Sequence, residues 1–93
     1  MPDAQTKAKL LGRLRRLQGQ VQGIQRMVEE DKPCADIVLQ LAAVRGAALE
    51  VSRLLLREHV EAAVAEAFRS GSARERQKKM DEVLEALARF SLR

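Results

Sequence analysis

The sequence predicts an all-α protein, and three observations lead to this expectation. Hydrophobic residues make up 46% of the chain, but aromatic residues make up only 2% and neither Trp nor Tyr occurs. Strong helix formers, above all Ala, Leu, Glu and Arg, dominate the composition. Apolar residues recur with helical spacing along three segments. The 93 residues predict one domain (1–93), and so short a chain buries a small core, which favours assembly into an oligomer.

The first helix is expected over residues 4–30. Its apolar residues alternate four and three positions apart, which is the spacing of a coiled-coil-like seam. The seam residues are Leu10, Leu14, Leu17, Val21, Ile24 and Val28. Residues 29–33 break the helix. Here Asp31 or Lys32 is expected to cap the next helix, with Pro33 in its first turn, where the missing N–H costs nothing.

The second helix is expected to run to about Phe68, longer than most helices of soluble proteins. It repeats the seam at Ile37, Leu41, Val44, Ala48, Val51 and Leu55. Matching seams joined by a short turn predict an antiparallel hairpin. Residues 70–72 end this helix, and residues 73–92 form a shorter third helix. Two such hairpins are expected to pair into a four-helix bundle, so that the smallest expected assembly is a dimer.

Positive charge is concentrated in the first helix. The chain carries a net charge of +4, and residues 1–26 contain six Lys and Arg against Asp3 alone. Arg13 and Arg16 lie in one crowded turn, and Arg45 interrupts a stretch of apolar and small residues. Duplicated by symmetry, these arginines predict a surface for the phosphate backbone of DNA. The alternative is that the charges only form a solvated face. No helix-turn-helix, zinc finger or basic zipper is evident.

Cys34 and His59, the only cysteine and the only histidine, are the candidate site residues. They lie 25 residues apart in one expected helix, which at about 1.5 Å per residue is roughly 37 Å. Because 25 residues are close to seven full turns, both side chains share a face, and two antiparallel chains are needed to bring them together. Either residue also has an ordinary role, Cys34 as a small hydrophobe and His59 as a solvated side chain.

The chemistry of this pair is limited by what accompanies it. A thiol in the first turn of a helix faces unpaired N–H groups, which favour the thiolate and make it a better nucleophile and metal ligand. A thiolate and an imidazole suit copper(I), nickel or zinc. Two donors are too few for a closed tetrahedral site, and the residue one turn after His59 is Ala63, which coordinates nothing. No catalytic constellation is evident, so no enzyme and no cofactor are expected.

The compartment is predicted to be the cytoplasm. A single cysteine cannot form an internal disulfide, and we identify no secretory leader and no apolar run long enough to cross a membrane. In that compartment the thiol stays reduced.

Several motifs resemble the CsoR/RcnR family of small all-helical bacterial repressors. These motifs are GRLRRLQGQ at residues 12–20, Cys34 at a helix start, QLAAVRGAA at residues 40–48, and His59. The resemblance implies dimers of antiparallel hairpins that pair into tetramers and bind operator DNA. It also implies an inducer site between subunits, made by Cys34 of one subunit and His59 of another.

Within that family the sequence is most similar to the formaldehyde-responsive FrmR branch. The copper sensors have a second cysteine where Ala63 stands, the nickel and cobalt sensors have a histidine there, and the persulfide sensors have a cysteine in place of His59. The FrmR branch has Pro2, one cysteine and one histidine, together with a run similar to residues 72–76 of this chain. Its usual acidic residue is replaced by Ala63.

In this branch, Pro2 and Cys34 would react with formaldehyde. Once Met1 is removed, Pro2 is a secondary amine that is partly neutral at cellular pH. Formaldehyde condenses with it to an iminium, and the Cys34 thiolate of another subunit adds to the carbon, leaving a methylene bridge. His59 would take the thiol proton or orient the amine.

The main expectation is therefore a homotetrameric repressor that binds its operator through Arg13, Arg16 and Arg45 and is released by formaldehyde. One alternative is a repressor of the same family that responds to copper(I) or nickel through Cys34 and His59. The other is a helical protein-interaction module.

Overall fold

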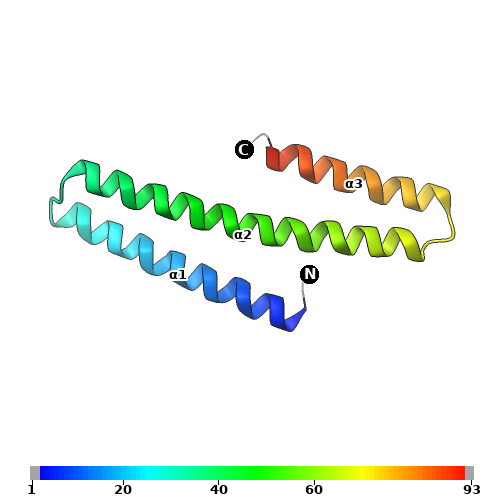
Figure 1. Ribbon diagram of the computed structural model, residues 1–93, viewed down its shortest axis with the longest axis horizontal. Coiled ribbons are helices and arrows are strands. Elements are labelled where there is room, and N and C mark those ends of the chain that lie inside the picture. Colours follow the sequence, from blue (N-terminus) through cyan, green and yellow to red (C-terminus); the bar gives the residue numbers. More distant parts are fainter. Residues whose placement is uncertain (1–2, 92–93) are drawn as a thin grey trace. The chain divides into compact units, whose positions relative to one another are not determined.

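The computed structural model describes residues 3–91, and its elements are three helices: α1 (Ala4–Glu29), α2 (Cys34–Arg69) and α3 (Ala73–Ser91) (Figure 1). No strand occurs in these residues, so the predicted all-α class is confirmed. The observed bounds lie close to those expected from the apolar periodicity. At 36 residues, α2 is the longest helix, as its uninterrupted pattern predicted. Leu92, the expected end of the third helix, lies outside the described residues.

Within residues 3–91, the chain forms two compact units that divide after Arg53, inside α2. In the first unit, α1 runs beside the first part of α2 as an antiparallel hairpin (Figure 1). In the second unit, α3 runs antiparallel beside the last part of α2. The short connections predicted at residues 29–33 and 70–72 produce these reversals of direction.

A side-chain cap begins α1. The Asp3 carboxylate accepts a hydrogen bond of 2.8 Å from the backbone N–H of Thr6, which satisfies one of the unpaired donors of the first turn. This bond holds the pKa of Asp3 below its usual value, because it stabilises the ionised carboxylate. This cap was not predicted from the sequence, although an aspartate directly before a periodic segment is a common helix start.

The turn between α1 and α2 differs from the prediction that Asp31 or Lys32 caps α2. Asp31 adopts a left-handed conformation with φ of 55°. The Asp31 N–H donates to the Val28 carbonyl (3.2 Å) and the Lys32 N–H donates to the Met27 carbonyl (2.9 Å), which is a Schellman ending of α1. Neither residue therefore caps α2.

Pro33 takes that role instead. Its carbonyl accepts the N–H groups of Asp36 (3.0 Å) and Ile37 (3.2 Å), so Pro33 precedes the helix rather than occupying its first turn. The expectation was wrong because the backbone of Asp31 and Lys32 is used to end α1. Cys34 is consequently the first residue of α2.

The start of α3 is capped by Ser72. Its hydroxyl accepts the N–H of Glu75 at 3.3 Å, which is half of a Ser-x-x-Glu capping box. An ion pair then joins α3 to α2: Lys79 Nζ lies 2.9 Å from the Glu66 carboxylate and 3.6 Å from that of Glu82. The pairing with Lys79 lowers the pKa of Glu66, and the pairing with Glu66 raises the pKa of Lys79.

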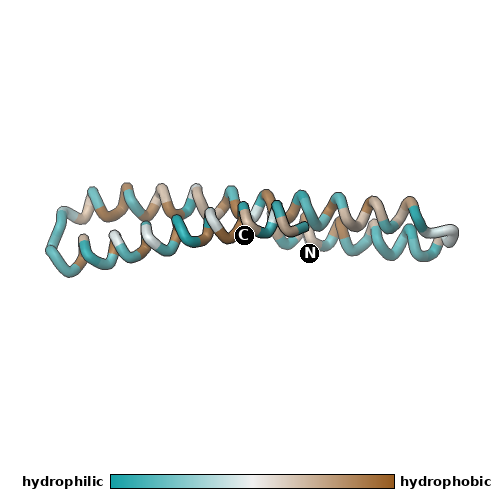
Figure 2. The backbone as a smooth tube through the Cα atoms, turned by 90° about the horizontal axis from the view of Figure 1, so that it is seen from below, coloured by the Kyte–Doolittle hydropathy of each residue, from teal (hydrophilic) through white to brown (hydrophobic). Residues whose placement is uncertain are grey.

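Few apolar side chains are buried within one chain. Among the described residues these are Leu10 and Val51 in the first unit and Ala63 and Val83 in the second. Other seam residues remain exposed in the single chain, such as Leu14 (45%), Val21 (45%) and Leu41 (50%). Hydrophobic and hydrophilic stretches alternate along the helices (Figure 2). Since two helices cover only part of each other's seam, the remaining apolar surface is suited to another copy of the chain.

Within residues 3–91, no helix combines the length and the apolar character that crossing a membrane requires.

Candidate functional site

The backbone of the turn places Cys34 at the positive end of the α2 dipole. The thiol is free and exposed. Because the Pro33 carbonyl accepts the first hydrogen bonds of α2, Cys34 stands directly at the helix start, where negative charge is favoured. The position is therefore compatible with both of the chemistries considered for this thiol, nucleophilic attack and coordination of a soft metal ion.

His59 lies in the second unit, where it lines a surface hollow of about 560 Å³ with side chains of α3. The α3 residues are Glu82, Glu85, Ala86, Arg89 and Phe90. Within the hollow, Arg89 and Glu85 form an ion pair of 2.6 Å. From the sequence, His59 was expected among charged residues of its own helix, and the charged residues of α3 were not predicted to lie near it. Only the way that α3 folds back on α2 brings them near.

Cys34 and His59 belong to different compact units of the chain, 25 residues apart in α2. Ala63, one turn after His59, is buried and has no donor atom. In the described part of the chain, no group of three or more His, Cys, Asp or Glu side chains is placed to hold a metal ion. Pro2, the third predicted sensing residue, lies outside the described residues.

Two of the three predicted DNA contacts come together in the first unit. Arg13 and Arg16 of α1 line a hollow of about 430 Å³ with Gln20 of α1 and with Ala47 and Glu50 of α2. Both arginines are exposed. The Gln20 side-chain oxygen is buried without a hydrogen-bond partner among the described residues, which costs free energy unless a donor enters the hollow.

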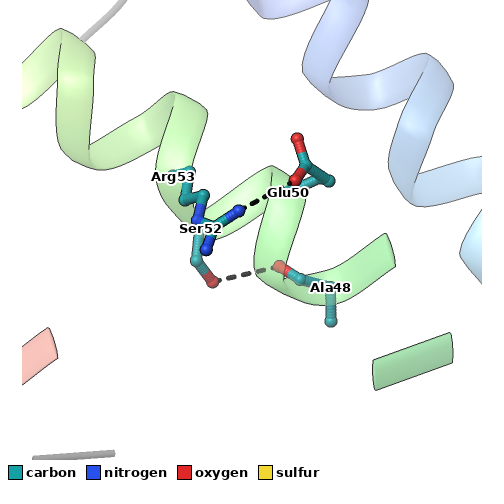
Figure 3. A network of polar contacts seen from close by, with 4 residues as sticks. All are labelled: Ala48, Glu50, Ser52 and Arg53. Atoms are coloured by element: carbon teal, nitrogen blue, oxygen red, sulfur yellow. Dashed lines mark hydrogen bonds and ion pairs between the residues drawn. The ribbon is translucent and has the colours of Figure 1, made fainter. Parts of the chain in front are cut away.

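Glu50 is a carboxylate that the sequence analysis did not connect with these arginines. It forms an ion pair of 3.2 Å with Arg53, one turn further along α2 (Figure 3). In the same stretch, the Ser52 hydroxyl donates to the Ala48 carbonyl at 3.1 Å (Figure 3). The hollow thus has a cationic side on α1 and an acidic group on α2.

Arg45 is exposed but does not line this hollow. At about 100° per residue, Arg45 lies about 140° around α2 from Glu50, so it projects from another face of the helix. The structure therefore unites Arg13 and Arg16 and leaves Arg45 as a separate positive group.

A sequence profile described as "Metal-sensitive transcriptional repressor" matches residues 6–89. The chain belongs to the CsoR/RcnR family of transcriptional repressors. Since that match spans most of this repressor, the resemblance inferred from the motifs is confirmed. Repressors are not enzymes, so the expected absence of catalysis is confirmed as well, and the alternative of a simple helical interaction module is set aside.

The relatives of this repressor are named for different effectors. The copper-sensing repressor CsoR of Bacillus subtilis is 39% identical over 85 residues, covering 91% of this chain and 81% of its own length. The nickel-responsive regulator InrS has a solved structure with a TM-score of 0.80 and 37% identity, covering 96% of this chain and 93% of InrS.

A variant of the formaldehyde-responsive regulator FrmR from Salmonella enterica serovar Typhimurium gives a TM-score of 0.75 at 29% identity, covering 97% of this chain and 99% of FrmR. The metal sensors therefore match this repressor with higher identity than FrmR does. The sequence-based preference for formaldehyde is not confirmed.

Proposed function

We propose that this chain is a homotetrameric, DNA-binding repressor, and that copper(I) bound between Cys34 of one subunit and His59 of another releases it from its operator. Membership of the family carries the repressor function. The proposed operator contacts are Arg13, Arg16 and Arg45, of which the first two share a hollow. A regulator of this kind acts on chromosomal DNA, and we expect it in the cytoplasm.

The donor set favours copper(I) among the metal ions. A soft thiolate and an imidazole are ligands that copper(I) accepts at low coordination number, whereas structural zinc requires four ligands. The Cys34 thiol is exposed and free to coordinate. Nickel, the effector named for InrS, is the second metal to test. Because Ala63 contributes no ligand, we expect nickel to bind more weakly than copper(I).

Formaldehyde is the second candidate effector, and one observation favours it specifically. In the described residues, no group of three or more His, Cys, Asp or Glu side chains is placed to hold a metal ion, whereas the bridge chemistry needs only a thiol and an amine. The Pro2 amine and formaldehyde lose water to form an iminium. The Cys34 thiolate then adds to its carbon, and the bridge retains one carbon from formaldehyde.

The two effectors are separated by one set of measurements on the full chain. Fluorescence anisotropy on a duplex from upstream of the chain's own gene follows release of DNA, and intact mass spectrometry follows the covalent bridge. Release by copper(I) with no change in covalent mass supports the metal proposal. A mass gain of one carbon on formaldehyde treatment supports formaldehyde as the effector if the gain is absent in Cys34→Ala and after chemical blocking of the N-terminal amine. If copper(I) then has no effect on DNA binding, the copper(I) proposal is overturned.

A further inference from the structure

The outer face of α1, which lies opposite its apolar seam, has an unusual composition. At about 100° per residue, Gly12, Gly19 and Gly23 fall within about 20° of one line along the helix. Four cations flank this glycine track within about 60° on either side: Lys9, Arg15, Arg16 and Arg26. We call these seven residues the outer α1 face. The same angular limits also include Gln5, Ala8 and Met27, but no acidic residue of α1.

The cations of the outer α1 face lack partners among the described residues. Some arginines elsewhere in residues 3–91 pair with a carboxylate one turn away, as Arg57 does with Glu61 (3.0 Å) and Arg89 with Glu85 (2.6 Å), whereas others, such as Arg45 and Arg74, do not. None of the four cations lies within ion-pair distance of a carboxylate in residues 3–91. The four side chains are also exposed. They are therefore available to an external anion.

The glycines of the track are not explained by packing within the chain. A Cβ atom added at Gly12 or Gly19 would meet nothing within 4 Å, and none of the five glycines has a positive φ. Glycine is nevertheless a poor helix former. At Gly23 the nearest atom to such a Cβ is a guanidinium nitrogen of Arg26, at 3.9 Å. A cation thus already lies along the track.

We propose that the outer α1 face is a second contact surface for the sugar-phosphate backbone of duplex DNA. It adjoins the hollow that holds Arg13 and shares Arg16 with it. This inference rests on the proposed repressor function. The absence of side chains lets the backbone approach the helix closely, and the flanking cations neutralise its phosphates. Such contacts are independent of base sequence.

Other occupants fit the outer α1 face less well. A second copy of α1 would bring cations against cations. A membrane surface requires several apolar side chains that enter the acyl region, whereas Met27, which is half-buried, is the one large apolar residue of α1 within the limits of this face. The partner that matches unpaired positive charge along a bare helix is a regular polyanion.

The glycine track is tested by Gly12→Ala, Gly19→Ala and Gly19→Gln. Because open space surrounds both positions and alanine favours helix, the two alanine variants are expected to melt at higher temperature than the wild type. Their affinity for duplex DNA is nevertheless expected to fall several-fold, and Gly19→Gln to bind more weakly than Gly19→Ala. Gly71→Ala, at an equally open glycine outside α1, is the matched control and should bind as the wild type does.

The cations are tested by Lys9→Gln, Arg15→Gln and Arg26→Gln. Each is expected to reduce the slope of log affinity against log salt concentration by about 0.9, the value for one lost phosphate contact. Lys78→Gln removes an exposed charge from α3 and should leave the slope unchanged. Circular dichroism confirms that each variant is folded.

A random 30-bp duplex and a duplex from upstream of the chain's own gene serve as probes. Variants that bind the upstream duplex as tightly as the wild type, with unchanged slopes, would overturn the outer-face proposal and leave the repressor function standing. A folded wild-type protein that binds neither duplex would overturn both.

Discussion

Replacing Glu50 by glutamine removes the one carboxylate from the hollow that holds Arg13 and Arg16. It also releases Arg53, whose guanidinium lies 3.2 Å from the Glu50 carboxylate. One additional phosphate contact steepens the dependence of log affinity on log salt by about 0.9. A fourfold change in salt concentration then alters the relative affinity of variant and wild type by about 3.5-fold, with the variant tighter at low salt.

The stability cost of this change is small. Both side chains of the pair are more than half exposed, at 61% for Arg53 and 56% for Glu50. An exposed pair of this kind contributes about 0.5 kcal/mol or less. Glu50→Gln should therefore unfold near the wild-type temperature, so that any change in DNA binding reflects the hollow and not the fold.

Glu61→Gln is the matched control for this experiment. It breaks a similar exposed pair on α2, between Arg57 and Glu61 at 3.0 Å, and it changes the net charge equally. Glu61 does not line the hollow. Affinity for duplex DNA is measured by fluorescence anisotropy over a range of salt concentrations without effector. If Glu50→Gln binds no more tightly at low salt than Glu61→Gln, the assignment of this hollow to DNA binding is refuted.

Four further outcomes are expected. Asp31→Gly should stabilise the protein by about 1 kcal/mol in urea unfolding, since glycine adopts the left-handed φ of 55° without strain; an unchanged midpoint would contradict this. Ser72→Ala should cost about 1 kcal/mol through loss of the α3 cap, while Ser91→Ala, at the far end of that helix, should not. Lys79→Gln should lower the melting temperature near neutral pH and match the wild type in acid. Lys79 lowers the pKa of Glu66, so the ionised Glu66 contributes stability above its unfolded pKa, and this stability is lost as the pH falls through the lowered pKa. A difference in melting temperature that persists in acid would argue against the pair. Cys34→Ala should bind DNA normally but no longer be released by either effector, and release that survives this change would exclude the thiol from the site.

The helices could be predicted from the sequence because their signals are local. The seam that begins at Leu10 follows the period of an α-helix, and a break rich in Gly and Ser around Gly71 separates two helical segments. The motifs around Arg13 and Arg45 were sufficient to suggest the family, which the comparisons then confirmed. Local patterns failed at the turn, where Asp31 ends α1 and does not begin α2, because its conformation depends on hydrogen bonds to the preceding turn.

The sequence by itself determined the all-α class, the three segments and the cationic outer face of α1, because each follows from the spacing of residues along a single helix. The tertiary structure decided which side chains meet across helices. Glu50 of α2 lines the same hollow as the arginines of α1. His59 lines a hollow with the carboxylates of α3, and Glu66 forms an ion pair with Lys79. These contacts depend on the rotation and register of one helix against another. That register is set by the conformation of the turns and by the few buried apolar side chains, which no periodicity within one helix specifies.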